Sequence, residues 1–482
     1  MNAHVRVALL LAALAGVSAA APTERAALFD GDPGWEGHNN RPRTPPREVR
    51  QDFGYSRTDH AGGEPGEIGG FVTPVAEPAY YALRLPRRTL RDRLSASGTF
   101  AAVGREFHVL VGLFNSRTLV GWRTPNTLAL RFYGRGDVFC VYLEYATSRW
   151  RAGADSPRGF TVRDPATGSA EMRGFASRGV VHRWSLTYDP DAAGGRGAIA
   201  ATIDDQTALC ELGEGHQQDG ATFDRFGLLP VLKQVDGAGE VWLDDVTVDG
   251  RTERFERDPG WDALGNRRNY RTGNVRPRFD FGFSPTRYAG GRRAGEIGGL
   301  VYRGDSTRPE TMAFYADRID QLSLDGPLRA SGRLALRHAV SDSTALIGFF
   351  HSRDTLEVEA AARHSLPRGF VGAAIEGPSA EGFLFYPVCR LRDGGDSRGR
   401  YDSAPHVYPD GAAHDWSLEF VPTPGGGGRL TAALDGHAST VRVPPERAGE
   451  NTRLDRFGIV TTAIDGNAQV VYFDDLRYTA RR

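Results

Sequence analysis

A duplicated segment constrains the fold of this chain more than any other feature of its sequence. Residues 52–72, DFGYSRTDHAGGEPGEIGGFV, return as residues 280–301, DFGFSPTRYAGGRRAGEIGGLV. The motif Asp-Pro-Gly-Trp stands before both segments, at residues 32–35 and 258–261. A match of this length within one chain indicates duplication, so the protein contains one module twice.

The correspondence continues to the end of the chain, where residues 241–246 match residues 471–476. Two copies of this length are whole domains, because solenoid repeats have periods of about 20–50 residues. We therefore predict three parts: a signal peptide at residues 1–21, a first domain at 22–250 and a second domain at 251–482.

The N-terminus indicates export. An apolar run at residues 7–17 follows Arg6 and ends in the small residues 18–21, the pattern of a cleavable signal peptide. The run is too short to span a bilayer, and no other stretch is apolar enough to do so. We expect a secreted protein, periplasmic or extracellular, without a membrane span. The odd number of cysteines (Cys140, Cys210 and Cys389) excludes full disulfide pairing.

Charge excludes one class of partner. The 482 residues carry a formal net charge of -1, so no overall basic field attracts nucleic acid. The positive charge is almost all arginine, since Lys233 is the only lysine. Two interpretations stay open: a base-composition bias of the genome, or guanidinium groups that bind carboxylates or sulfates through two hydrogen bonds.

The local pattern is one of strands and turns. Residues 183–188, RWSLTY, alternate between apolar and polar, as do residues 198–203 and 241–248. Clusters of Gly, Asp, Asn and Pro interrupt such runs every ~8–12 residues, and no stretch keeps a helical period. The sequence therefore predicts an all-β fold of two tandem antiparallel β-sandwich domains of the jelly-roll kind.

One pattern near the end of each copy is similar to a known family. Residues 184–189, WSLTYD, precede a Gly-rich turn and an alternating strand that ends at Asp204, and the second copy keeps WSL at residues 416–418. This resembles the concanavalin A-like (laminin-G-like) jelly-roll modules of secreted bacterial proteins. The ends of each copy also resemble galactose-binding-type jelly rolls, but the length of each copy favours the first family. The resemblance implies a lectin-like fold, and in such jelly rolls a calcium ion often joins the first strand to the last.

Calcium ligands would come from the ends of each copy. Adjacent strand residues face opposite sides, so only one member of each closing Asp-Asp pair, 244–245 and 474–475, faces inward. Calcium needs six or more oxygen ligands, some of them from the backbone or water. The candidate ligands are Asp30 or Asp32 with Asp245, and Glu256 or Asp258 with Asp475. The alternative is that these aspartates cap backbone amides at turns.

The repeated GEIGG motif allows two interpretations. In the first, it forms a bulged strand entry, with Ile68 in the core and Glu67 held by an arginine. In the second, Glu67 is a carboxylate placed at a sugar site. Glu67 and its counterpart Glu296 are present in both copies. A residue shared by both copies marks what the fold requires, so this favours the first interpretation.

Residues that differ between the copies are better candidates for function. His60 is replaced by Tyr288 in the second copy, and Trp122 lies in a Gly/Pro loop where its indole would offer a stacking surface to a sugar. Strand alternation puts Tyr142 and Glu144 on one face, together with Cys140. The candidate ligand-binding residues are His60, Asn115, Trp122, Arg123, Asn126, Arg131, Tyr142 and Glu144. The alternative is that the tyrosines only pack the sandwich.

The leading hypothesis for function is a protein that binds a polysaccharide or a cell-surface glycan, mainly through the first copy. An alternative is a polysaccharide lyase or glycoside hydrolase in which His60, Glu67, Tyr142 and Glu144 are the available acid–base groups and Arg123 or Arg131 neutralises charge. The sequence lacks the E-x-D-x-x-E, G-x-S-x-G and H-E-x-x-H motifs. A third hypothesis is a structural or adhesive surface protein with no glycan site.

Overall fold

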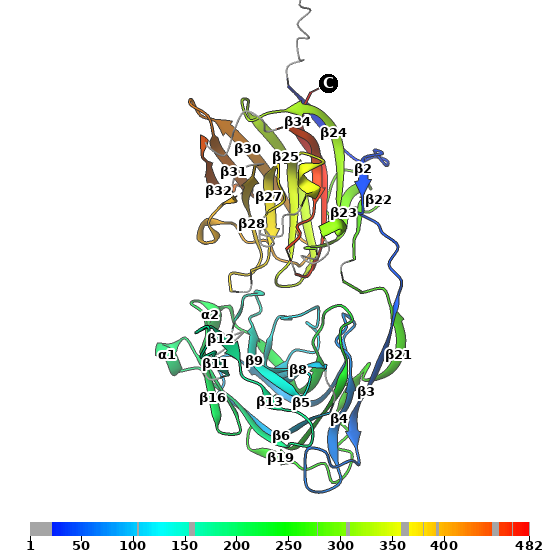
Figure 1. The fold of residues 1–482 in the computed structure, drawn as a ribbon, viewed down its shortest axis with the longest axis vertical. Coiled ribbons are helices and arrows are strands. Elements are labelled where there is room, and N and C mark those ends of the chain that lie inside the picture. The colour runs from blue at the N-terminus through cyan, green and yellow to red at the C-terminus, as the bar shows by residue number, and fades with distance from the viewer. Residues whose placement is uncertain are drawn as a thin grey trace, which may run out of the picture.

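Antiparallel strands dominate the structure, and the all-β prediction is confirmed (Figure 1). The computed structural model describes residues 22–103, 106–153, 160–276, 278–304, 309–357, 366–378, 380–391, 395–445, 453–464 and 466–481. In this part of the chain four large sheets form two sandwiches, one above the other along the long axis. The predicted signal peptide lies outside the described residues.

The first sandwich consists of two sheets, here named after a central strand. The β8 sheet has the order β10 (Ala152–Gly153), β9 (Val138–Ala146), β8 (Thr127–Arg135), β7 (His108–Phe114), β17 (Thr222–Pro230), β5 (Tyr80–Thr89), β20 (Asp262–Leu264), with β13 (Phe175–Ala176) also on β9. The β6 sheet has the order β16 (Gln206–Glu211), β15 (Ala198–Ile203), β14 (His182–Asp189), β6 (Leu94–Val103), β18 (Gly239–Val248), β4 (Glu67–Val72), β3 (Arg47–Ser56), β21 (Arg267–Thr272), with β19 (Arg251–Glu253) on β18. The smaller elements are the pair β11 (Thr161–Arg163) and β12 (Ala170–Met172), and the single turns α1 (Ala192–Gly195) and α2 (His216–Asp219).

The second sandwich has the same plan. The β27 sheet has the order β2 (Glu36–His38), β24 (Phe314–Leu322), β33 (Leu454–Val460), β26 (Thr344–Phe350), β27 (Phe370–Glu376), β28 (Leu384–Arg390), β29 (Ser397–Arg398). The β25 sheet has the order β22 (Asp280–Ser284), β23 (Glu296–Tyr302), β34 (Ala468–Ala480), β25 (Leu328–Ala339), β30 (Ala413–Pro422), β31 (Gly428–Leu434), β32 (His437–Val443), with β1 (Thr23–Ala27) on β34. Short 3-10 turns lie at Pro309–Thr311, Asp354–Leu356 and Tyr401–Ser403.

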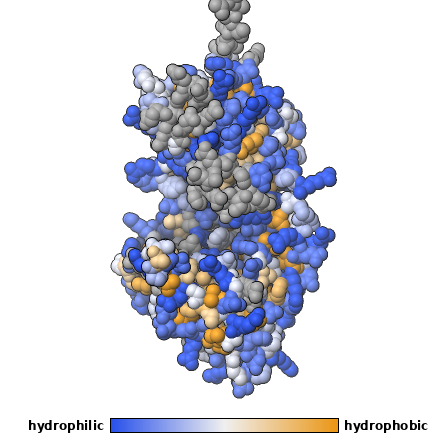
Figure 2. Space-filling view, in the orientation of Figure 1, coloured by the Kyte–Doolittle hydropathy of each residue, from blue (hydrophilic) through white to orange (hydrophobic). Residues whose placement is uncertain are grey.

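Strand alternation builds the core between the two sheets of each sandwich. Along β14, Trp184, Leu186 and Tyr188 are buried while the residues between them face outward. Phe100 of the β6 sheet stacks on Phe132 of the β8 sheet, with the ring centroids 4.0 Å apart. Figure 2 shows that the outside is mostly hydrophilic on the face in view, with scattered hydrophobic areas.

Each sandwich is completed by the N-terminal segment of the other copy. The first arm, residues 22–41, precedes the first sandwich in sequence, yet β1 pairs with β34 and β2 pairs with β24 of the second sandwich (Figure 1). The second arm, residues 251–267, supplies β20 to β5 and leads into β21, which pairs with β3. The predicted boundary at residue 250 divides the duplicated sequence, whereas each sandwich takes strands from both copies. The chain therefore crosses between the sandwiches twice, at residues 41–46 and again after β21.

The two arms bind in the same way. Trp35 of the first arm lies 5.9 Å from the ring of Tyr315, and Trp261 of the second arm lies 5.9 Å from the ring of Tyr81. The side-chain amide of Asn40 donates a hydrogen bond of 2.5 Å to a backbone carbonyl of β22. Asn266, the counterpart of Asn40 in the second arm, donates the equivalent hydrogen bond to a backbone carbonyl of β3. This repeated set of contacts makes the exchange a property of the duplicated module.

The first glycine of the GEIGG motif makes room for an arm. A Cβ atom at Gly66 would lie 2.1 Å from the carbonyl oxygen of Phe255, and one at Gly295 would lie 1.8 Å from that of Phe29. Both glycines also have positive φ angles of 130–134°, which L side chains rarely adopt. The repeated motif is therefore the surface on which the exchanged arm docks. Among the described residues, no helix is long and apolar enough to cross a membrane.

Candidate functional site

The outer face of the β8 sheet carries the polar residues that the sequence predicts for the first copy. Val141 and Leu143 of β9 point into the core, so Tyr142 and Glu144 between and beyond them point away from it. In the ladder between β8 and β9, Arg131 lies opposite Tyr142. The predicted common face of Tyr142 and Glu144 is thus what the register produces.

A buried ion pair forms the centre of this face. Nε of Arg131 pairs with Oε1 of Glu144, and both residues are at most 5% exposed. Nε1 of Trp122 donates a hydrogen bond of 3.1 Å to the same carboxylate oxygen. The Arg131 guanidinium lies 4.0 Å above the ring of Tyr142 and 5.0 Å from that of Trp122. These four residues, with His108 and Tyr133, are called the Arg131 cluster below.

His108 is a member of the cluster that sequence reasoning missed. Its Nε2 lies 2.8 Å from Nη1 of Arg131, which can only donate. Burial, together with the charges of Lys233 and Arg131, holds the pKa of His108 well below its usual range. The ring is therefore neutral and accepts from Arg131, which removes it as an accessible general base. Its position at the start of the apolar run HVLVGLF was the available signal.

Two buried polar atoms of the Arg131 cluster have hydrogen-bonding capacity that the described residues do not use. Nδ1 of His108 and Oε2 of Glu144 are buried and make no hydrogen bond with any described residue. The rings of Trp122, Tyr133 and Tyr142 around them are partly exposed. The face thus combines three accessible aromatic rings with a charged pair whose polar atoms are not all used.

The neighbouring loop is held by the two predicted asparagines. Asn115 Nδ2 donates a hydrogen bond of 2.9 Å to the hydroxyl of Thr222, and Asn126 Oδ1 accepts one of 2.9 Å from the Thr222 amide. Their side chains anchor residues 115–126 to β17 instead of facing a ligand. Arg123 of this loop lies 5.2 Å from the Trp122 ring and 4.0 Å from Asp342 of the second sandwich.

His60 and Glu67 lie on the other sheet. His60 stacks on Trp242 at 4.5 Å, and its Nδ1 lies 2.8 Å from Oε1 of Glu67. The second oxygen of Glu67 accepts a hydrogen bond of 2.7 Å from the amide of Ala61. Ile68 is in the core, as predicted, but the prediction that an arginine holds Glu67 is wrong. Backbone amides bind this carboxylate, because the preceding loop folds back over the strand entry.

This arrangement places the acid–base groups that were proposed for an enzyme on two different sheets. Glu67 points outward from the β6 sheet and Glu144 outward from the β8 sheet, so the core separates them. Stacked sheets are already about 10 Å apart, and paired carboxylates for glycoside cleavage stand about 5–9.5 Å apart. His60 with Glu67, and Tyr142 with Glu144, form two separate pairs.

The predicted calcium ligands of the first arm lie on the second sandwich. Oδ1 of Asp32 accepts hydrogen bonds from the amide of Gly34 at 2.9 Å and from Tyr315 at 3.4 Å, and Asp30 pairs with Arg293 at 3.1 Å. Asp245, their predicted partner, is on β18 of the first sandwich. The exchange of arms separates the members of this set.

The second set is separated in the same way. Asp258 accepts a hydrogen bond of 3.0 Å from Tyr81 of the first sandwich, Glu256 is exposed, and Asp475 is on β34. The buried member of each closing pair is the first one, Asp244 or Asp474. The described residues include no group of three or more His, Cys, Asp and Glu side chains that could hold a metal ion.

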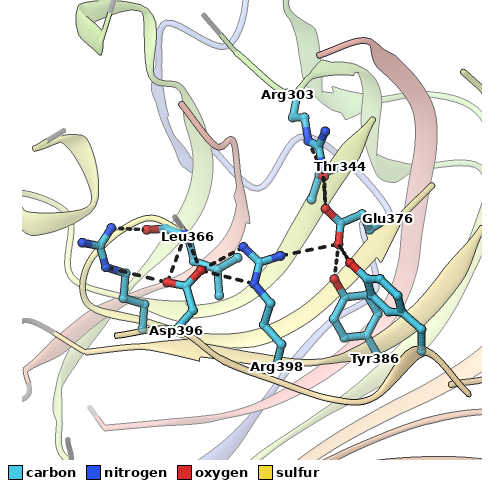
Figure 3. Close-up of polar contacts among 9 residues, drawn as sticks. Arg303, Thr344, Leu366, Glu376, Tyr386, Asp396 and Arg398 are labelled. Atoms are coloured by element: carbon cyan, nitrogen blue, oxygen red, sulfur yellow. Dashed lines mark hydrogen bonds and ion pairs between the residues drawn. The ribbon is translucent and has the colours of Figure 1, made fainter. Parts of the chain in front are cut away.

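The second sandwich has its own polar cluster on the same outer face (Figure 3). Glu376, 3% exposed, accepts hydrogen bonds from Tyr386, from Arg303 at 2.5 Å and from Thr344 at 3.2 Å. Figure 3 shows Arg398 between Glu376 and Asp396, with which it pairs at 3.5 and 2.9 Å. Sequence reasoning missed this cluster, although a glutamate that ends the apolar run FVGAAIE was a signal for it.

Arginines compensate the buried carboxylate of Glu376 in this second cluster. Burial alone raises the pKa of Glu376, but Arg303, Tyr386 and Arg398 lower it below its ordinary value. Burial and the adjacent carboxylate raise the pKa of Tyr386 well above its usual range. Ala374 and Val388 stand in the second copy at the register positions of Arg131 and Glu144. Only the tyrosine is common to both faces.

No protein-family model and no curated protein matches the sequence. Among solved structures, the chain is similar to domains LG4-5 of the mouse laminin α1 chain, with 11% identity, 86% of this chain and 90% of that chain covered, and a TM-score of 0.24. It is also similar to the carbohydrate recognition domain of Emp47p (9% identity, 39% and 85% covered, TM-score 0.26). A third similar structure is the endo-β-1,4-glucuronan lyase from the fungus Trichoderma reesei, with 11% identity, 46% of this chain and 94% of that chain covered, and a TM-score of 0.23. At these TM-scores the likenesses carry no inference about what this chain binds.

Proposed function

We propose that the protein is exported and binds a polysaccharide or a cell-surface glycan through the Arg131 cluster of the first sandwich. The observation that carries the proposal is the set of three partly exposed aromatic rings around the buried Arg131–Glu144 pair. Aromatic rings stack on the apolar faces of sugars, and charged groups beside them fix hydroxyl orientation. Export rests on the apolar run at residues 7–17.

Binding is favoured over catalysis by the same geometry. No candidate base is available beside the Arg131–Glu144 pair among the described residues. His108 is buried and hydrogen-bonded to Arg131, and His60 lies with Glu67 on the opposite sheet. A structural surface protein without a glycan site is the remaining alternative, and it predicts no retention by any polysaccharide.

Affinity electrophoresis of the purified chain through gels that contain neutral or uronic polysaccharides tests the proposal. We expect retardation by at least one of them, without new reducing ends or unsaturated products. Trp122→Ala is expected to weaken retention about tenfold, because the indole is one of the three aromatic rings on which a sugar can stack. Tyr288→Ala, on the second sandwich and 38% exposed, is the matched control. Unchanged retention in Trp122→Ala, with an unchanged melting temperature, would exclude this face.

A further inference from the structure

The two connections between the sandwiches concentrate positive charge. Residues 41–50 and 267–278 contain nine arginines and a single acidic residue, Glu48. Figure 1 shows these stretches along one side of the molecule, where β21 lies next to β3. The whole chain carries a formal net charge of -1, so this accumulation is local.

Two adjoining grooves are lined by five of these arginines. One groove runs between the connections and is lined by Arg43, Arg47 and Arg276, with Pro42 and Phe279 among its apolar walls. The other lies over the edge formed by β3 and β21. Both grooves include Arg47, so they meet there. The arginine groove is defined here by Arg43, Arg47, Arg50, Arg271 and Arg276.

The fold does not neutralise all of this charge. Arg43, Arg47 and Arg271 are exposed and form no ion pair with any described residue. Arg50 pairs with Asp52 at 2.7 Å.

The acidic residues that line the grooves are fewer. Asp236 pairs with Lys233 at 2.5 Å, which leaves Glu48 and Glu310 as the remaining carboxylates. Apart from these two ion pairs, Arg43, Arg47 and Arg271 face the carboxylates of Glu48 and Glu310. The groove therefore keeps a net positive charge.

The chemistry of the groove favours an acidic glycan over nucleic acid. Proteins that hold single-stranded nucleic acid stack its bases on open aromatic rings. Here the ring of Phe71 lies under Arg50 at 5.1 Å, and that of Tyr270 under Arg268 at 4.4 Å. Guanidinium forks bind carboxylate, sulfate and phosphate groups alike with two parallel hydrogen bonds, so the covered rings, and not the positive charge, favour a glycan.

We propose that the arginine groove binds an anionic polysaccharide whose sugars carry carboxylate or sulfate groups. This deepens the proposed function by naming a ligand class, and it rests on that function only for the choice of a glycan. The groove lies on the crossing connections and not on the Arg131 cluster, so the two sites can be tested separately.

The test compares the full chain with two triple variants. The groove variant carries Arg43→Gln, Arg47→Gln and Arg271→Gln. The control carries Arg91→Gln, Arg178→Gln and Arg183→Gln, three exposed arginines of the first sandwich outside the groove, and has the same net charge. Affinity electrophoresis in polyuronate, sulfated polysaccharide and neutral dextran is run at low and moderate salt. We expect retardation by the acidic polymers only, weakened by salt, and at least tenfold weaker in the groove variant than in the control.

Three results would overturn the proposal: no retardation by any acidic polymer, equal weakening in both variants, or equal affinity for single-stranded DNA. Trp122→Ala separates this site from the Arg131 cluster. If only Trp122→Ala loses retention, the proposed function stands and the groove proposal fails. If only the groove variant loses it, the groove proposal stands and the Arg131 cluster is excluded. Circular dichroism of all variants confirms that they are folded.

Discussion

At the residue scale, Asp244 and Asp474 are buried carboxylates that form no ion pair with any described residue. Oδ1 of each accepts a hydrogen bond of 2.7 Å from the next amide along the chain. A Cβ atom at Gly62 or Gly291 would lie within 1.8 Å of the second oxygen, so glycine is required opposite it. Both copies repeat this arrangement, which places an uncompensated acid under the loop before the GEIGG motif.

Asp474→Asn is expected to stabilise the protein at neutral pH. Burial, with the charges of Asp475 and Glu296, raises the pKa of Asp474 from 3.8 to about 6. A raised pKa in the folded state gives stability that is complete below about pH 4 and is lost as the pH rises through about 6. Urea unfolding should show a gain of about 1–3 kcal/mol at pH 7.5 and little gain at pH 4. Asp320→Asn, at an exposed position of β24, is the control, and a gain that does not depend on pH would contradict this account.

The Arg131–Glu144 pair makes a second prediction at this scale. Removing one partner leaves a buried charge, so Arg131→Ala should cost about 3–5 kcal/mol. The second copy has Ala374 and Val388 at these positions and packs without such a pair. Arg131→Ala with Glu144→Val should therefore recover most of the loss in a double-mutant cycle measured by chemical denaturation. If the double variant is as unstable as the single one, the pair is not replaceable by apolar packing.

Part of this site could be predicted from the sequence, for physical reasons. Strand period alone puts Tyr142 and Glu144 on one face, because register cannot slip without exposing the core. Trp122, Arg123 and Arg131 reach that face as well. His60 could not be excluded, since no pattern states to which sheet its loop belongs. Asn115 and Asn126 carry side chains equally suited to ligands and to loop anchoring, and only the neighbouring Thr222 decides between these uses.

At the element scale, the arms explain why the longest match between the copies lies where it does. Each arm brings a tryptophan, an asparagine and a short strand to the other sandwich, and the glycines of GEIGG receive it. The all-β class and the paired copies could be predicted, because they depend on local period and on self-similarity. The exchange could not be predicted, because both arms and both docking surfaces have nearly the same sequence. Only the path of the connections determines which surface each arm reaches.

Replacing either docking glycine tests the arms as elements. Gly295→Ala would force a side chain into a positive φ and against the carbonyl of Phe29, so we expect a loss of about 1–3 kcal/mol or more. Limited proteolysis should then cut the first arm faster than in the native chain. Gly63→Ala is the matched control, since a Cβ atom there meets nothing within 4 Å. Equal proteolysis of the two variants would mean that the arm does not depend on this contact.

At the scale of the whole molecule, the exchange makes the two sandwiches mutually dependent. The chain starts on the second sandwich, builds the first, and returns to finish the second (Figure 1). Loops at the junction also touch, since Nε2 of His216 lies 3.0 Å from the carbonyl oxygen of Ala380. A cut at residue 250 therefore separates the first sandwich from the second arm, which carries Trp261, and from β21. A cut that follows the strands would separate residues 47–276.

The fragments defined by these two boundaries are expected to differ in oligomeric state. Residues 47–276 contain the first sandwich with its docked arm and should be a stable monomer.

Residues 22–250 carry the first arm, which matches the docking surface that the second arm occupies in the full chain. Folding back onto its own sandwich would require residues 41–46, RPRTPP, to pair along β3, and their three prolines cannot donate to a ladder. The arm should therefore dock on a second copy, so light scattering after gel filtration should give a dimer. Trp35→Ala should shift this dimer towards monomer and lower its stability, since the indole packs against the rings of Tyr315 and Tyr478. Two monomeric fragments of equal stability would mean that the arm is dispensable and that the strand pairing does not define the folding unit.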